Sequence, residues 1–143
     1  MLAQASPVPW SVVFILMFVV GVTMIGVGYL ITGIANRGSA GELDRNGIAG
    51  IRTKATMASD EAWLTAHQVG RDRTAQGGQL IKLSGLLAAP AGLAIGGGSP
   101  NRALLVWGIV FGLTQVAALW LIVRGAIAGD RAAQRVVDEA STN

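Results

Sequence analysis

The segment Val8–Ile34, with the sequence VPWSVVFILMFVVGVTMIGVGYLITGI, contains no charged residue. The hydrocarbon core of a bilayer is about 30 Å thick, so a spanning helix needs roughly 20 apolar residues. This segment is longer than that and can cross with some tilt. A cleaved signal peptide would have a basic start and an apolar core of roughly 7–15 residues. We therefore predict that the segment is a retained membrane-spanning helix.

A second long apolar segment, Ala103–Val123, lies between Arg102 and Arg124 and is itself uncharged. Trp107 and Trp120 stand near its two ends, and tryptophan is enriched at membrane–water interfaces. This pattern predicts another spanning helix.

Between these two segments, Leu80–Gly97 is shorter and contains Lys82 and Pro90. Lys82 lies about one turn inside the segment, from where its ammonium can reach the lipid headgroups. A proline is tolerated in a spanning helix when neighbouring groups satisfy the carbonyl that it frees. We expect a third span here, with a re-entrant or interfacial hairpin as the alternative.

The basic residues predict the orientation, because short loops rich in Lys and Arg stay in the cytoplasm. No basic residue precedes the first span, and only Arg102 lies between the later two. Most of the others fall in the loop 35–79 and the tail 124–143: Arg37, Arg45, Arg52, Lys54, Arg71, Arg73, Arg124, Arg131 and Arg135. We predict an all-α, single-domain membrane protein (1–143) with an outer N-terminus, spans at about 8–34, 80–97 and 103–123, and a cytoplasmic loop and tail.

The composition excludes several classes of function. Of the 143 residues, 52% are apolar and only 13% are charged, whereas soluble domains have about a quarter charged residues. No cysteine is present, which removes disulfides, thiolate metal sites and cysteine nucleophiles. One histidine and scattered carboxylates form no metal-ligand pattern, and no G-x-S-x-G sequence occurs, so we expect neither a cofactor nor catalysis. Residues 35–82 have a net charge of only +2, which does not call for a nucleic-acid partner.

Helices in lipid associate through close backbone approach and hydrogen bonds between helices, because apolar burial does not drive their contact. Small and polar residues at helical spacing are the expected contacts: Gly21, Gly28 and Thr32 in the first span, and Gly108, Gly112 and Gln115 in the third. Gln115 is the strongly polar side chain deep in a span, and it either holds helices together or belongs to a transport path. Transport sites generally use ionisable groups, and none lies near the middle of the bilayer here. We therefore favour a contact between helices.

The loop 35–79 begins with a polar, glycine-rich stretch and continues into a predicted short helix. Ser59 is a suitable N-cap, while Asp60 and Glu61 place negative charge at the positive end of the helix dipole. We expect Gly70 to end this helix. Trp63 would lie on its apolar face, so we predict an amphipathic helix on the membrane surface with the indole among the headgroups.

Within this loop, the pattern of residues resembles the signature segment of the SdpI family of bacterial membrane proteins. The residues that carry the resemblance are Asn46, Gly50-Ile51-Arg52-Thr53, Thr56, Ser59, Glu61, Trp63 and His67. Lys54 departs from the family pattern, where proline is expected, and the long form of the family has about twice as many spans. The chain therefore looks like the short, single-domain form. The resemblance implies a multi-pass protein of the bacterial inner membrane that protects against a secreted toxin and draws a small repressor to the membrane.

Three residues or segments have two interpretations each. Arg52, next to Thr53, could bind an anionic group such as a lipid phosphate, or could pair with Asp60 or Glu61 and hold the loop in shape. His67 could be a pH-sensitive contact or an ordinary hydrogen-bonding residue. A helix predicted at 130–140 could be a solvated surface or a docking site.

Two functions from different classes are expected. The first is a non-catalytic immunity or signal-transduction factor of the SdpI type. The alternative is a small accessory or stabilising subunit of a larger membrane complex, such as a transporter or a respiratory or cell-envelope assembly, or a homo-oligomer, because glycine stripes offer helix contacts. An enzyme acting on lipid is least favoured.

The orientation gives a direct test. A reporter enzyme that works only in the cytoplasm, fused after Asn143, is expected to be active, because the basic residues of the loop and tail stay inside. Activity of only an extracytoplasmic reporter at the same position would reverse the predicted topology.

Overall fold

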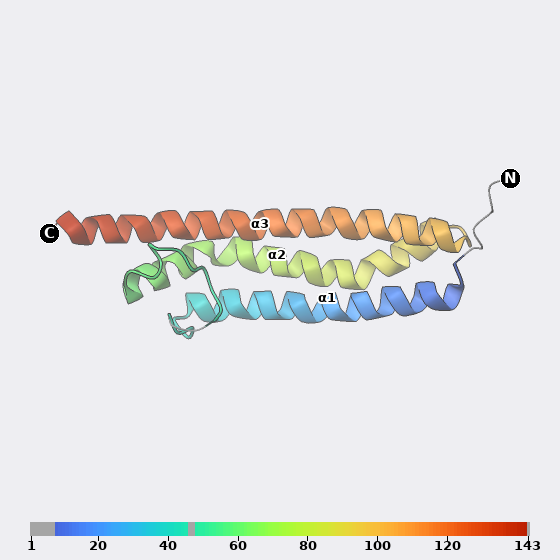
Figure 1. The fold of residues 1–143 in the computed structure, drawn as a ribbon, viewed down its shortest axis with the longest axis horizontal. Coiled ribbons are helices and arrows are strands. Elements are labelled where there is room, and N and C mark those ends of the chain that lie inside the picture. Colours follow the sequence, from blue (N-terminus) through green and yellow to red (C-terminus); the bar gives the residue numbers. More distant parts are fainter. Residues whose placement is uncertain (1–7, 46–47, 143) are drawn as a thin grey trace.

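The computed structural model describes residues 8–45 and 48–142, and it consists of three helices. They are α1 (Trp10–Ser39), α2 (Asp60–Ile95) and α3 (Pro100–Thr142) (Figure 1). Each is long and apolar enough to cross a membrane. The prediction of an all-α protein with three candidate spans is therefore confirmed.

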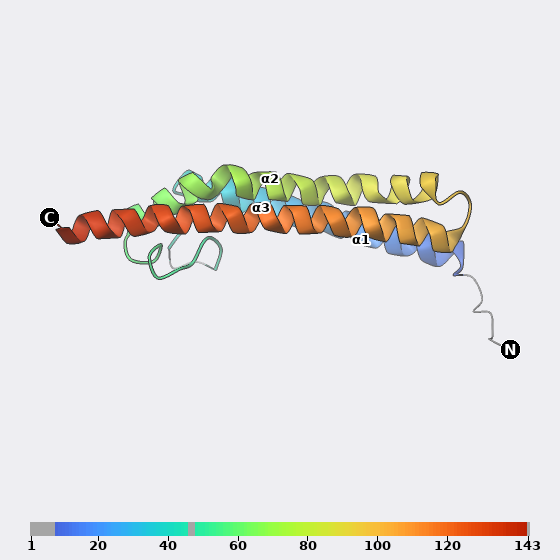
Figure 2. The same cartoon turned by 90° about the horizontal axis from the view of Figure 1, so that it is seen from above.

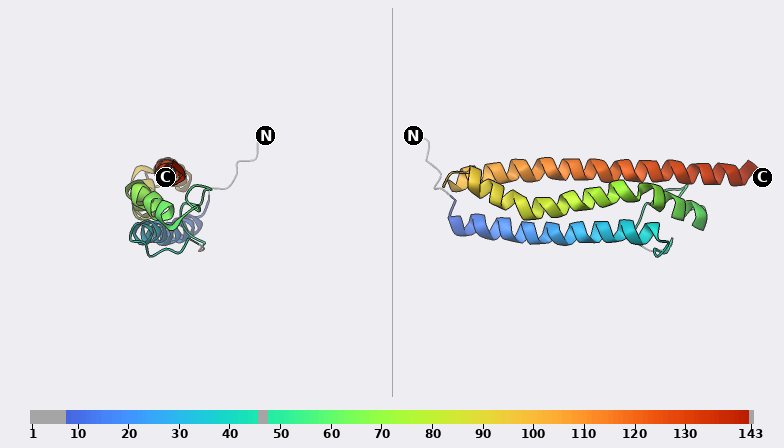
Figure 3. Two further views of the ribbon diagram at one scale, coloured as in Figure 1. Left: turned by 90° about the vertical axis from the view of Figure 1, so that its left-hand side faces the viewer. Right: turned by 180° about the vertical axis from the view of Figure 1, so that it is seen from behind.

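The helices form an elongated bundle in which α2 lies between α1 and α3 (Figures 1 and 2). α1 and α3 have scarcely any contact with each other. A tight turn containing Gly97 and Gly98, both with positive φ, joins α2 to α3 at the end where α1 begins. The loop between α1 and α2 lies at the opposite end, beside the C-terminal half of α3 (Figure 3). The loop and the tail thus share one end of the bundle.

Both predicted loop and tail helices are continuous with the neighbouring spans, which corrects the expectation of separate short helices. α2 runs through Gly70 without a break, and α3 runs from the third apolar segment through Asp130 to Thr142. Gly70 does not end a helix. It lies inside α2 at a close contact between helices, where a Cβ would lie 2.9 Å from the carbonyl oxygen of Gly125. Pro90 lies inside α2, and a proline within a helix favours a bend. Figure 1 shows that α2 is not straight.

α1 and α2 approach each other backbone to backbone. A Cβ on Gly21 would lie 2.8 Å from the carbonyl oxygen of Gly85, and a Cβ on Gly78 would lie 3.0 Å from that of Gly28. The Thr32 hydroxyl, which faces Gly78, donates to the carbonyl of Gly28 at 2.7 Å. The three residues expected on α1 therefore lie in this interface, where they meet glycines of α2.

α2 meets α3 through a second series of small residues. Close backbone approaches join Gly92 to Ala103, Gly77 to Ala118, Gly70 to Gly125 and Ala66 to Gly129, each with a Cβ-to-carbonyl distance of 2.5–2.9 Å if a Cβ were added to the glycine. Gly70 and Gly77 on α2 and Ala118 and Gly125 on α3 are spaced by seven residues, the repeat that keeps two helices in contact over many turns. α2 therefore presents small residues on both faces.

The third span uses a different face from the one expected. A Cβ on Gly108 or Gly112 would meet no atom within 4 Å in the described part of the chain, so this pair makes no helix contact there. At that level Trp107 occupies the face of α3 toward α2, with its Cβ against Gly92. Gln115 does reach α2: its Nε2 donates to the hydroxyl of Ser84, a buried residue, at 2.7 Å.

A glycine inside a helix contact, Gly78, and a glycine facing open space, Gly112, allow a matched comparison of stability. Gly78→Ala is expected to destabilise the protein by about 1–3 kcal/mol, because its Cβ would meet the Thr32 side chain and backbone of α1. Gly112→Ala is expected to be neutral or slightly stabilising, because the site is open and alanine favours helix more than glycine does. Thermal unfolding of both purified variants in the same detergent measures the difference. Equal losses of stability would contradict this packing.

Candidate functional site

The residues of the predicted signature form a compact loop at one end of the bundle; we call residues 48–59 the motif loop. Its centre is Thr56, whose side chain is fully buried (0% exposed). The Thr56 hydroxyl donates to the carbonyl of Ile51 at 2.7 Å and accepts from the backbone N–H of Thr53 at 2.9 Å. The Thr56 N–H in turn donates to Oγ1 of Thr53 at 3.2 Å. The Thr56 hydroxyl therefore links both ends of the turn at residues 51–56, which stabilises the motif loop without regular secondary structure.

Gly50 lies against two aromatic rings of α2. Its φ of +118° is in the region that glycine adopts without strain, and a Cβ there would lie 2.5 Å from Nε2 of His67 and 2.7 Å from the Trp63 ring. The two rings are in contact, with centroids 4.2 Å apart. The position therefore requires glycine for conformation and for space.

His67 joins the motif loop to α2 and α1. Its Nε2 accepts from the backbone N–H of Ile51 at 3.0 Å, so the proton is on Nδ1, which donates to the carbonyl of Trp63 at 2.8 Å. The residue is 4% exposed, and its ring also touches Gly38 at the end of α1. His67 thus forms hydrogen bonds at both ring nitrogens.

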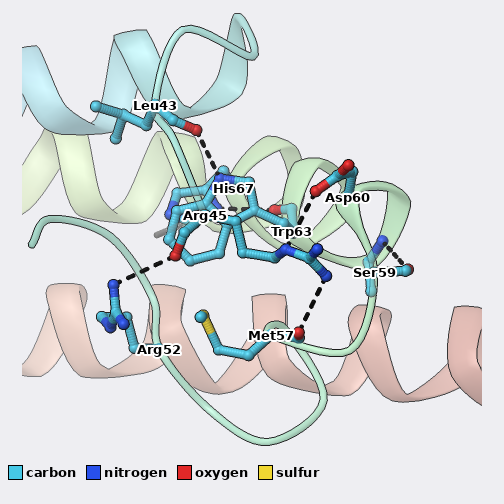
Figure 4. A network of polar contacts seen from close by, with 9 residues as sticks. Leu43, Arg45, Arg52, Met57, Ser59, Asp60, Trp63 and His67 are labelled. Atoms are coloured by element: carbon cyan, nitrogen blue, oxygen red, sulfur yellow. Dashed lines mark hydrogen bonds and ion pairs between the residues drawn. The ribbon is translucent and has the colours of Figure 1, made fainter. Parts of the chain in front are cut away.

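The position of Trp63 corrects the expectation of an indole among the headgroups. Its side chain is 4% exposed, and Nε1 donates to the carbonyl of Leu43 at 2.9 Å (Figure 4). The adjacent Ala62 and Ala66 pack against Ala133 of α3. The apolar face of this part of α2 is thus covered by protein, because the loop and α3 close over it.

Arg45, which the sequence does not mark, forms an ion pair with Asp60, one of the two carboxylates considered as partners of Arg52. Its Nε lies 3.1 Å from Oδ1 of Asp60, and its Nη1 donates to the carbonyl of Met57 at 3.1 Å (Figure 4). Arg52 is exposed, and its Nη1 donates to the carbonyl of Arg45 at 3.3 Å. No local spacing indicates Arg45, because its partners are brought to it only by the course of the loop.

The remaining motif residues contact the helices. The side chain of Ile51 fits into a gap between α2 and α3, where a Cβ on Gly70 or Gly129 would approach its Cδ1 to 2.9 and 3.0 Å. The Thr53 hydroxyl donates to the carboxylate of Asp130 on α3. Asp130 is another residue that sequence reasoning missed, since the two are far apart in the chain.

Two further predicted residues lie at the start of α2. Ser59 is its N-cap, as the sequence predicts, and its hydroxyl accepts from the Ala62 N–H at 3.0 Å. Glu61 follows in the first turn and is exposed. Asn46 lies outside the described residues.

Beneath the motif loop is a cavity of about 280 Å³, which exists because α1 and α3 do not close against each other over α2. Its walls are mostly apolar and include three polar side chains, those of His67, Arg71 and Thr74. The lining residues are Ile31, Ile34 and Ala35 of α1, Gly50 and Ile51 of the motif loop, His67, Gly70, Arg71 and Thr74 of α2, and Ile122 and Ala126 of α3. We call it the loop cavity. No group of three metal-ligating side chains occurs among the described residues.

These features define a small, multi-pass helical membrane protein whose motif loop covers an apolar cavity at one end of the bundle. Residues 42–126, more than half of the chain, match the SdpI/YfhL protein family. The chain therefore belongs to the SdpI/YfhL family. The matched range contains the motif loop, all of α2 and most of the apolar part of α3. Neither the curated proteins nor the solved structures gave a match.

Two loop glycines test the role of Gly50. Gly41 also has positive φ (+76°), but a Cβ there would meet only Leu64, at an ordinary 3.7 Å. Gly50→Ala is expected to speed tryptic cleavage after Arg52 and Lys54 at least about tenfold, because cleavage follows the population of the opened loop. Gly41→Ala carries the backbone strain alone and is expected to have a clearly smaller effect. Similar cleavage rates for the two variants would show that Gly50 does not need to lie against His67 and Trp63.

Proposed function

We propose that this protein acts without catalysis in the bacterial inner membrane, as an immunity and signal-transduction factor whose motif loop and loop cavity form the recognition site. The observation that carries the proposal is the construction of the loop: Gly50, Ile51 and Thr53 each hold it against a helix, and Gly50 and Ile51 line a mostly apolar cavity. A preorganised cover over a cavity suits binding, because little ordering is needed when a ligand arrives.

The polar groups of the site are already engaged. Both ring nitrogens of His67 have partners within the chain, and the Thr56 hydroxyl is buried and satisfied on both sides. A general base needs a free nitrogen within reach of its substrate. The arrangement therefore supports recognition better than proton transfer.

The loop cavity lies at a level that an amphipathic ligand can reach. Of the lining residues, Ile34 is at the end of the first apolar run and Ile122 is near the end of the third, while Arg71 supplies a charged group. An apolar segment could enter between α1 and α3, with its polar end near Arg71. This chemistry fits an amphipathic segment of a membrane-active toxin, and the loop surface above fits a cytoplasmic partner such as a small repressor.

The second candidate is an accessory subunit of a larger membrane complex, or a homo-oligomer. It is favoured by the open face of α3 at Gly108 and Gly112, where a Cβ would meet nothing in the described chain. Small residues on a lipid-facing helix allow a further helix to approach closely. Copurification from native membranes distinguishes the candidates, because a stoichiometric large partner is expected only for the second.

The immunity proposal predicts that a strain without this protein is inhibited by spent medium of its parent strain. Wild-type protein should restore growth, whereas Ala126→Trp should not, because the indole fills the loop cavity. Leu113→Trp is the matched control on α3, since Leu113 is exposed on the apolar surface of the bundle. Growth curves with equal membrane levels of each variant provide the measurement. Unchanged tolerance in the deletion strain, or full rescue by Ala126→Trp, would contradict the proposal.

A further inference from the structure

Three arginines gather around one hollow on the surface between α2 and α3. The hollow has a volume of about 380 Å³ and is lined by Arg73 of α2 and by Arg124, Ile127, Ala128 and Arg131 of α3. Arg124 and Arg131 are seven residues apart and therefore lie on the same face of α3. No carboxylate lines the hollow. We call it the basic hollow.

The arginines of the basic hollow form no ion pair within the part of the chain that the structure describes. Arg37, Arg45 and Arg71 have carboxylate partners there, whereas Arg73, Arg124 and Arg131 have none. The two nearest carboxylates along the chain are already engaged. Asp72 pairs with Arg71 at 2.8 Å, and Asp130 accepts from Thr53 and from Gln134. Holding three guanidinium groups together costs electrostatic energy that a bound anion would recover.

The packing of the helices brings these arginines together. A Cβ on Gly125 would lie 3.3 Å from Cβ of Arg73 and 2.8 Å from Oγ1 of Thr74. Because Gly125 has no side chain, the Cβ of Arg73 can pack against α3, beside Arg124. The cluster is built on two rigid helices in direct contact, so its geometry exists before a ligand arrives.

The hollow lies at the boundary of the apolar bundle surface. Arg124 directly follows the uncharged run that ends at Val123, and its guanidinium lies over the ring of Trp120, 4.9 Å from the centroid. Trp120 is 57% exposed on the apolar surface. Exposed tryptophan with adjacent arginine is typical of the headgroup level of a membrane. Phosphates of lipid headgroups are therefore the anions expected at this height.

We propose that the basic hollow binds the phosphate headgroup of an anionic phospholipid, with Ile127 and Trp120 against its acyl chains. Arginine forks bind phosphate oxygens in pairs, and basic pockets between spanning helices on the cytoplasmic side suit anionic headgroups. Three guanidinium groups match a headgroup with two phosphates, as in cardiolipin, better than one with a single phosphate. The site is separate from the loop cavity and does not depend on the proposed immunity function.

The test uses the purified full-length chain and native mass spectrometry with added cardiolipin or phosphatidylcholine. The wild type is expected to retain cardiolipin selectively. The triple variant Arg73→Gln/Arg124→Gln/Arg131→Gln should bind it at least about tenfold more weakly. The control Arg37→Gln/Lys54→Gln/Arg102→Gln removes the same charge elsewhere and should bind nearly as the wild type does. A triple Arg→Lys variant keeps the charge and is expected to lose cardiolipin affinity to an intermediate degree, because lysine lacks the planar guanidinium that binds phosphate through two N–H groups.

Three outcomes would overturn the proposal: equal binding by wild type and the Gln triple, equal losses in the two Gln triples, or displacement of cardiolipin by inorganic pyrophosphate. The first would show that the hollow is not the site, and the second that only net charge matters. The third would show a site for a soluble phosphate. Circular dichroism and size-exclusion profiles of each variant show whether it is folded. If the Gln triple does not fold, the single variant Arg124→Gln is used instead, and it is expected to show a smaller loss of cardiolipin affinity.

Discussion

The close approach of α2 to both of its neighbours is the constraint on which the rest of this structure depends. Gly78 and Gly85 meet the backbone of α1 on one side, and Gly70 and Gly77 meet that of α3 on the other. In lipid, such contacts replace the hydrophobic effect that holds soluble helices together. Because α2 occupies the middle, α1 and α3 stay apart, and the loop cavity remains between them. The same contacts leave the gap that receives Ile51 and place Arg73 beside α3.

The motif loop shows how a short irregular segment is held at the end of such a bundle. Its buried polar groups have partners: the described residues contain no buried side-chain nitrogen or oxygen without a hydrogen bond. His67 joins three parts of the chain, because it accepts from the loop, donates to its own helix and lies against the end of α1. A buried polar network with every member satisfied favours one arrangement, since an unpaired group would be costly. The loop is therefore suited to present a fixed surface.

The two proposed sites lie on the same end of the bundle but differ in chemistry. The loop cavity is mostly apolar and lies between α1 and α3, whereas the basic hollow is formed by arginines of α2 and α3. Gly70 and Gly125, in contact with each other, stand near both. A lipid held in the basic hollow would thus lie close to the helix pair that also forms one wall of the cavity. The proposed lipid site and the proposed recognition site thus both lie beside the contact between Gly70 and Gly125.

The sequence by itself determined the features that depend on local chemistry. Long apolar runs, two of them uncharged and one containing Lys82, predicted the candidate spans. Ser59 before two acidic residues predicted a helix start, and the spaced motif residues predicted the family. It did not determine which face a helix turns to its neighbour. From the sequence, Gly70 is expected to end a helix, Gly108 and Gly112 to contact a neighbouring helix, and Trp63 to lie among lipid headgroups. In the fold Gly70 lies inside α2, Gly108 and Gly112 face open space, and Trp63 is buried. Only the tertiary structure decided these positions and the pairing of Arg45 with Asp60, because helix rotation and the course of the loop follow from contacts between residues distant in the chain.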